Sequence, residues 1–212
     1  MLSERHRLME SGVAGLTAED LIGGHACLDF VNTAGGGGKS RDLDRMVSYE
    51  LLANWAELAG LLTAREAASL RRLAKVSPDA AVSALKQTLR FREDLYACLM
   101  ALATDGVVPA ESWQAITSQM TQCLAASHLK RGPSAFTRAI ELEDGELDTI
   151  LLRIGLLAND LLLSDDLRRL KNCDRCSWLY LDRSKGGRRR WCSMRACGNR
   201  AKVQRFAERQ RD

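Results

Sequence analysis

Apolar residues recur at intervals of three and four along most of the chain, which predicts a largely helical protein. The repeat extends over 49–59, 63–75, 78–103, 109–127 and 147–163. Local signals agree with three of these starts, because Thr63 and Glu66 form a capping box and Pro78 and Pro109 suit the start of a helix. Shorter helices are expected over 167–170 and from 198 to about 210.

Two short segments alternate between apolar and polar residues, which is the pattern of a half-buried strand. In 26–32, Leu28, Phe30 and Asn32 would share one face and Asp29 would lie on the other. The segment 136–142 alternates in the same way and is expected to pair with 26–32. The predicted fold class is therefore mainly α with a small β-hairpin or two-stranded sheet.

Four of the seven cysteines lie near the C-terminus in two close pairs. They are Cys173, Cys176, Cys192 and Cys197, with two residues inside the first pair, fifteen between the pairs and four inside the second. This spacing is typical of a tetrahedral zinc site, and four thiolates fill its coordination shell. We therefore expect one structural Zn²⁺. The alternative is a disulfide pair or four unrelated buried thiols. The sequence shows no secretory signal pattern, which argues against disulfides.

The segment between the two cysteine pairs predicts a hairpin. Residues 177–181 would form its first strand, Gly186 and Gly187 its turn, and 188–191 the returning strand. A helix would start beside Cys197, where its N-terminus favours a thiolate. This order indicates a treble-clef-like zinc finger over 171–212, attached to a helical N-terminal domain over 1–170.

Two motifs carry a resemblance to known families. The run WCSM at 191–194, followed by CGNR at 197–200, resembles the signature of the CGNR zinc finger. The stretch GGHACLDFVNT at 23–33 is similar to the N-terminal signature of the ABATE domain, which is described as a stress-induced transcription regulator of bacteria. The resemblance implies a transcription regulator whose partner is double-stranded DNA.

The distribution of charge agrees with a nucleic-acid partner. Residues 171–212 hold 13 basic and 4 acidic residues, a net charge of +9, whereas residues 1–170 carry −5. Such a split is typical of a nucleic-acid-binding module on an acidic body. The candidate contact residues are Arg188, Arg189, Arg190, Arg195, Asn199, Arg200, Lys202, Arg205 and Arg209.

These candidates have simpler interpretations as well. The arginines could form a solvated face that only keeps the protein in solution. Asn199 has the donor and acceptor needed to read adenine, but a residue at a helix start commonly caps the helix or bonds a thiolate. Along the new helix, Val203 and Phe206 form an apolar stripe that is expected to pack on the hairpin.

A second candidate site lies near the N-terminus. Asp29 and Asn32 either hydrogen-bond neighbouring backbone or line a pocket for a small-molecule ligand. The nearby Gly38-Lys39-Ser40 resembles the end of a phosphate-binding loop, but that motif also needs glycine at position 33, where Thr33 stands. A nucleotide site is therefore not expected here.

The remaining sequence narrows the functional classes. Residues 1–170 contain no nucleophile–base pair, carboxylate dyad or cofactor loop, so we expect no enzyme. No apolar run approaches twenty residues, so no membrane span is expected, and a cytoplasmic location follows. The leading hypothesis is a zinc-dependent DNA-binding regulator with a sensing or assembly domain. The alternative is a protein- or RNA-binding zinc module on a small-molecule-binding helical domain; a homodimer stays open.

Overall fold

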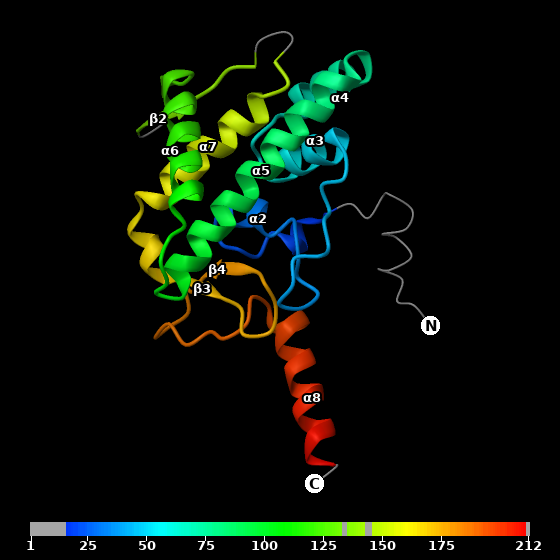
Figure 1. The fold of residues 1–212 in the computed structure, drawn as a ribbon, viewed down its shortest axis with the longest axis vertical. Helices are drawn as coiled ribbons and strands as arrows, with labels where there is room; N and C mark the ends of the chain where they lie inside the picture. The colour runs from blue at the N-terminus through cyan, green and yellow to red at the C-terminus, as the bar shows by residue number, and fades with distance from the viewer. Residues whose placement is uncertain (1–15, 133–134, 143–145, 211–212) are drawn as a thin grey trace.

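The computed structural model describes residues 16–132, 135–142 and 146–210, so 1–15 of the predicted N-terminal domain and 211–212 of the predicted finger lie outside the described residues. It confirms a mainly helical fold with two small sheets (Figure 1). The α-helices are α2 (Ala26–Val31), α3 (Tyr49–Leu58), α4 (Ala64–Val76), α5 (Pro78–Ala103), α6 (Ala110–Ala125), α7 (Thr149–Leu162) and α8 (Asn199–Arg209). The strands are β1 (His128–Arg131), β2 (Phe136–Ala139), β3 (Leu170–Asn172) and β4 (Leu179–Leu181). Short 3-10 turns cover Ala18–Asp20 and Asp165–Arg169, and a π-helical turn covers Met194–Gly198.

The long helices begin where the local signals place them. The Thr63 hydroxyl accepts a hydrogen bond from the Glu66 backbone N–H at 3.2 Å, and the Glu66 carboxylate accepts one from Thr63 N–H at 2.7 Å. Pro78 is the first residue of α5, where its missing N–H costs nothing. These caps satisfy backbone donors that a helix start leaves unpaired.

Helix α5 runs through the body and contacts every other long helix there (Figure 1). Its apolar face joins α2, α3 and α7 in one core, in which the rings of Phe30 and Trp55 lie 5.2 Å apart. Trp113 of α6, in contrast, is exposed. None of the described helices has the length and apolar character needed to cross a membrane.

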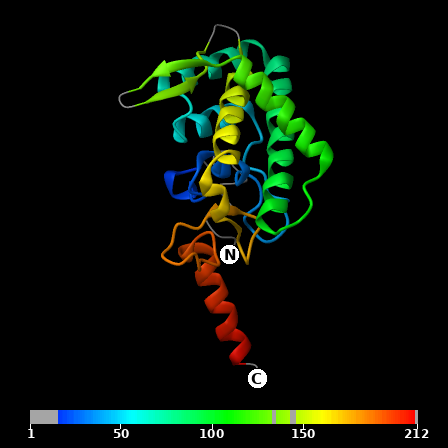
Figure 2. The same cartoon turned by 90° about the vertical axis from the view of Figure 1, so that its left-hand side faces the viewer.

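The prediction of a strand over 26–32 is wrong, because these residues form helix α2. The His25 imidazole caps it by accepting from Cys27 N–H, and Cys27, Leu28, Phe30 and Val31 are all fully buried. The buried positions 27, 28, 30 and 31 fit the three- and four-residue spacing of a helix, but in so short a run the alternation of a strand fits part of the same pattern. The strand within 136–142 therefore pairs elsewhere, with β1 in an antiparallel hairpin at the end of the molecule opposite α8 (Figure 2).

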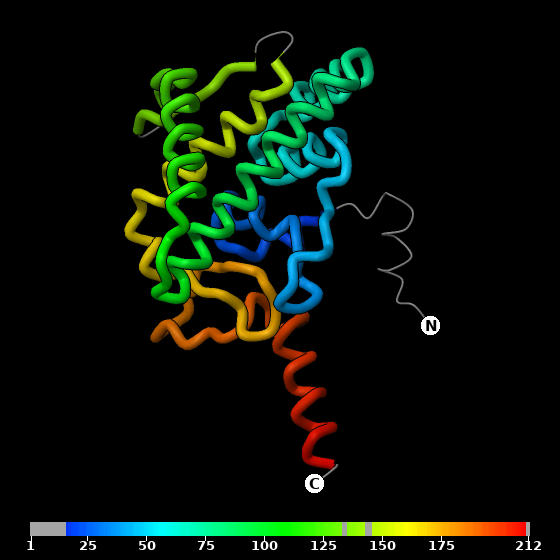
Figure 3. The backbone as a smooth tube through the Cα atoms, viewed as in Figure 1, coloured from blue at the N-terminus to red at the C-terminus, as the bar shows by residue number. Residues whose placement is uncertain are grey.

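The finger begins inside the core of the body. Strand β3 pairs antiparallel with β4, with Leu170 opposite Leu181 and Asn172 opposite Leu179. Leu170, Leu179 and Leu181 are buried in the same core as the helices. The tube view shows the light-blue loop after α2 lying against the orange segment that follows β3 (Figure 3). Helix α8 projects away from the body (Figures 1 and 2).

The expected returning strand over 188–191 is also absent from the structure, where these residues have no ladder partner. Side chains take the place of a strand, since the Tyr180 hydroxyl donates to Arg189 O at 2.7 Å and the Asp182 carboxylate accepts from Arg189 N–H at 2.9 Å. The partner of β4 is β3, which precedes the first cysteine pair.

Candidate metal centre and nucleic-acid interface

The four predicted cysteines converge on one buried point. The sulfur atoms of Cys173, Cys176, Cys192 and Cys197 all lie within 4.8 Å of one another, and none forms a disulfide. Cys192 Sγ lies 3.7 Å from the sulfurs of both Cys176 and Cys197. Four sulfurs held tetrahedrally at a zinc–sulfur distance of about 2.3 Å would be about 3.8 Å apart. The donor set and its spacing therefore fit a tetrahedral metal ion.

Different local structures deliver the ligands. Cys173 and Cys176 lie in the turn between β3 and β4, where Cys173 N–H donates to Trp178 O at 2.9 Å. Cys197 lies in the π-helical turn that continues directly into α8. A movement of the metal site would therefore change the direction of α8.

Neighbouring side chains hold these ligands in place. Arg189 turns inward, donates to the backbone oxygens of Trp191 and Cys192, and packs its guanidinium 4.4 Å from the centre of the Tyr180 ring. Arg200 donates to Cys197 Sγ at 3.6 Å, which favours the thiolate form. Hydrogen bonding, first of all with Cys176, lowers the pKa of the Cys173 thiol.

Close packing explains why a glycine occupies position 198 of the CGNR motif. A Cβ on Gly198 would lie 2.7 Å from the sulfur of Met194 and 3.5 Å from the ring of Trp191. Glycine thus allows these two side chains to close over the start of α8, beside the metal ligands.

The glycine-rich loop at 35–38 packs against the segment that carries the first two cysteines and supports the metal site. Its sequence alone did not indicate this role. Gly36 has a φ of 97°, and a Cβ there would lie 2.7 Å from the Trp178 ring. Ser177 N–H donates to Gly38 O at 2.8 Å, and Lys39 Nζ donates to Cys173 O at 2.5 Å. The loop therefore lies flat on the segment that carries the first two cysteines.

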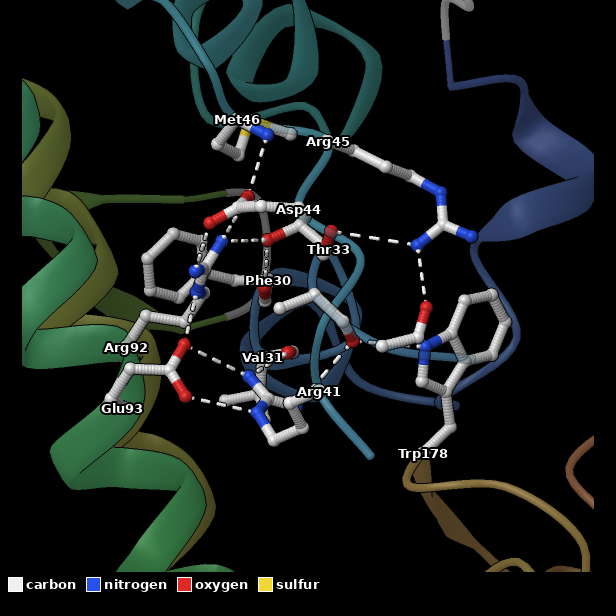
Figure 4. Close-up of polar contacts among 12 residues, drawn as sticks. Phe30, Val31, Thr33, Arg41, Asp44, Arg45, Met46, Arg92, Glu93 and Trp178 are labelled. Atoms are coloured by element: carbon white, nitrogen blue, oxygen red, sulfur yellow. Dashed lines mark hydrogen bonds and ion pairs between the residues drawn. The ribbon is translucent and has the colours of Figure 1, made fainter. Parts of the chain in front are cut away.

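Two ion pairs connect the chain that follows this loop to helix α5 (Figure 4). Arg92 of α5 has an exposed fraction of 3% and forms two bonds with the Asp44 carboxylate, at 2.9 and 2.6 Å. Arg41 pairs with Glu93 in the same bidentate way, at 2.9 and 3.1 Å. Trp178 completes the connection by donating its indole N–H to Ala34 O at 3.2 Å. Helix α5 is thus joined to the metal site through the loop.

The two candidate ligand-pocket residues have structural partners. Asn32 has an exposed fraction of 2%, and its carboxamide bonds both backbone groups of Leu179. Asp29 accepts from Gly23 N–H at 2.7 Å, and burial raises the pKa of its carboxyl to about 6. A cleft of about 920 Å³ lies instead between Glu19, Arg45 and the start of α8, and neither residue lines it.

The structure divides the candidate contact residues into two sets. Arg189, Arg190, Arg195, Arg200 and Arg205 all have internal partners: Arg190 pairs with Asp174 and Arg195 with Glu19, each at 2.6 Å, and Arg205 donates to Ala201 O. Arg188, Lys202 and Arg209 are exposed and have no hydrogen-bond or ion-pair partner among the described residues. Lys185, which is not among the predicted contact residues, is also exposed and has no such partner among the described residues.

Asn199 is the first residue of α8 and does not cap it, since Gly198 holds the cap position and no side-chain bond among the described residues caps this helix. The Asn199 side-chain amide donates to Arg195 O at 3.2 Å, one turn earlier. The expected packing of the apolar stripe on the hairpin is wrong, since Val203 and Phe206 are 69% and 65% exposed. Within the described part of α8 no residue is buried.

A four-cysteine metal site closing a helical body is the arrangement of a zinc-finger protein. Family models match the chain in two consecutive parts. Residues 24–165 match ABATE, "Putative stress-induced transcription regulator", and residues 169–210 match the CGNR zinc finger. The chain belongs to the ABATE family and ends in a CGNR zinc finger. No curated protein matches it.

Proposed function

We propose that this protein is a cytoplasmic DNA-binding regulator that uses its finger to contact double-stranded DNA, with one structural zinc ion. The proposal rests on α8, which is anchored at the metal site, projects from the body and carries no buried residue. Four of its residues are basic and one is acidic. Its side-chain contacts with the rest of the finger include a bond from Arg175 to Gln204 and the approach of Arg205 to the Trp191 ring. A cationic helix that leaves most of its surface exposed is suited to a polyanion.

Zinc is the metal that best fits the ligands. A tetrahedral set of four thiolates binds zinc or an iron–sulfur centre, and the sulfurs are packed at the separation expected for a single ion. With four protein ligands no position remains for a reactive water, so the ion would shape the finger and take no part in a reaction. The protein is then a binding protein and not an enzyme.

The free cations are the ones we assign to phosphate contact. Arg188, Lys202 and Arg209 have their charged ends in solvent, so they lose no internal partner when they bind. The inward-facing Arg189 would give up its bonds to the ligand-bearing backbone, so we assign it to the finger's own structure. The ABATE domain would hold the finger in place and supply sensing or assembly.

Salt-dependent binding tests this function. Arg188, Lys202 and Arg209 are replaced together by glutamine, and affinity for duplex DNA is measured by fluorescence anisotropy over a range of salt. Each phosphate contact adds about 0.9 to the slope of log affinity against log salt, so we expect weaker binding on all sequences and a slope reduced by about 2 to 3.

A matched variant controls for the loss of net charge. Lys75, Lys86 and Arg90 are exposed on α4 and α5, outside the finger, and their replacement by glutamine removes the same charge. If both triple variants weaken binding equally, the finger makes no local contact. If the wild-type protein with zinc binds no duplex at any salt concentration, the function is wrong, and a protein or RNA partner takes its place.

A further inference from the structure

Two large apolar side chains on α8 face solvent beside the basic ones. Val203 and Phe206 are 69% and 65% exposed, and Val203 lies at the edge of the cleft that the start of α8 forms with Glu19 and Arg45. At 100° per residue, Asn199, Val203 and Phe206 fall on one uncharged stripe of the helix. Lys202 and Arg209 border this stripe on one side.

A second copy of the chain is a poor occupant for this stripe. Two side chains bury far less than the roughly 800 Å² per partner that a stable interface needs. Pairing α8 with its copy would also oppose two helices that each carry a net charge of +3. Like charges across an interface oppose association, so the charge pattern favours an anionic partner.

The dimensions of α8 match the major groove of DNA. Eleven residues give a length of about 16 Å, and a helix about 10–12 Å wide enters a groove about 12 Å wide. With the stripe toward the floor of the groove, Lys202 and Arg209 would reach phosphates on one wall. The apolar group that the floor offers is the methyl group of thymine.

We infer that α8 is the reading element of the finger and that Phe206 and Val203 bind thymine methyl groups, so that the protein prefers A·T base pairs. This inference rests on the proposed DNA binding and adds the base preference to it. Asn199 contributes no base contact while its amide bonds Arg195 O. Base preference then comes from the apolar stripe, and affinity from the free cations.

Deoxyuridine isolates the methyl group, because it keeps the charge and hydrogen-bonding pattern of thymidine. The zinc-loaded full-length protein is titrated with three duplexes of equal length: alternating A–T, the same duplex with deoxyuridine for thymidine, and alternating G–C. We expect affinity to fall about fourfold for each methyl group buried, and to fall on the G–C duplex as well. F206A should lose the part of the thymine preference that Phe206 supplies, and the double variant V203A/F206A should bind the thymine and deoxyuridine duplexes equally.

Phe136 of β2 provides the matched control, since it is the same residue type with 67% exposure at the far end of the molecule. F136A should keep the wild-type preference for thymine. Unaltered salt-dependent binding without a thymine effect overturns the inference but leaves DNA binding intact. Absence of duplex binding removes both. A wild-type dimer that F206A converts to a monomer in sedimentation would assign the stripe to a second copy and overturn the inference too.

Discussion

Asn32 and Leu179 are joined by two hydrogen bonds, in which the Asn32 side-chain amide donates to Leu179 O at 2.8 Å and Leu179 N–H donates to the Asn32 side-chain oxygen at 2.9 Å. The carboxamide acts like a short piece of neighbouring strand at the free edge of β4. Through it, the end of α2 is fixed to the finger's first hairpin. Both groups are buried, so water cannot replace either bond.

Asn32→Ala should destabilise the protein by about 2 to 5 kcal/mol, because it leaves a buried N–H and a buried C=O without partners. Urea denaturation of the zinc-loaded protein measures the change. Asn54, exposed on α3 and bonded only to Arg71, is the control, and Asn54→Ala should cost less than about 1 kcal/mol. If the two variants were equally stable, the two hydrogen bonds of Asn32 would not stabilise the fold as proposed.

Gly36→Ala should destabilise the packing of the loop 35–38 against the metal site. The new Cβ meets the Trp178 ring, and the positive φ is strained for any side chain, so the loss should reach about 2 kcal/mol or more. A Cβ on the adjacent Gly37 meets nothing within 4 Å, so Gly37→Ala is the control and should change stability little. Competition with a chelator gives a second readout, in which only the Gly36 variant should release zinc faster.

Removing the metal should disturb the body as well as the finger. Cys192→Ser, or a chelator, should raise hydrogen exchange in α8 and also in the loop 35–38, where the Gly36 N–H donates to the Ser177 hydroxyl of the finger. The helices α3 to α7 should keep most of their protection. Cys98→Ser controls for loss of a buried thiol away from the metal site. Protection of the loop that does not change on zinc removal would contradict the coupling.

Asp29 predicts a pH dependence of stability. Burial raises the pKa of its carboxyl to about 6 from an ordinary value of 3.8, so the folded state favours the protonated form. The stability that this proton contributes is fully present below pH 4 and is lost as the pH rises through 6. Asp29→Asn should therefore raise the free energy of unfolding by about 1 to 2 kcal/mol at pH 8 and change it little at pH 4. Equal effects at the two pH values would contradict this assignment.

Glu19 should weaken DNA binding in the wild-type protein. Its carboxylate lies 2.6 Å from Arg195 in an exposed ion pair that costs little to break. Glu19→Gln frees Arg195, so we expect modestly tighter binding and a salt slope larger by about 0.9. Glu111→Gln on α6 removes the same charge far from the finger and should leave the slope unaltered.

The features that the sequence predicted correctly are local ones. Caps such as Thr63–Glu66 and the cysteine spacing depend on residues a few positions apart, so a single segment contains the whole signal. Helix α2 was missed because a run of six residues is too short for periodicity to separate a helix from a strand. The strand predicted over 188–191 fails because the backbone of Arg189 bonds the side chains of Tyr180 and Asp182, and Arg190 O accepts from Asp174 N–H, so the described residues form no strand ladder there.

Contacts between distant segments had no such local signal. Nothing near Asn32 indicates that its partner lies 147 positions later, and nothing in the glycine run at 35–38 indicates that it supports a tryptophan. The sequence also contained no sign that Arg189 differs from the arginines on either side of it. In the fold, the Arg189 guanidinium packs on the Tyr180 ring and donates to Trp191 O.

Because the loop 35–38 packs against the finger, the finger cannot be treated as a module that is exchanged by itself. The two family matches meet between residues 165 and 169, yet the packed surface between them consists of this loop, Asn32 and the hairpin of β3 and β4. A chimera whose new finger lacks a tryptophan at position 178 would leave the surface of Gly36 without the ring that packs on it. Finger and loop must therefore be exchanged together, and the natural unit of recombination is discontinuous along the gene.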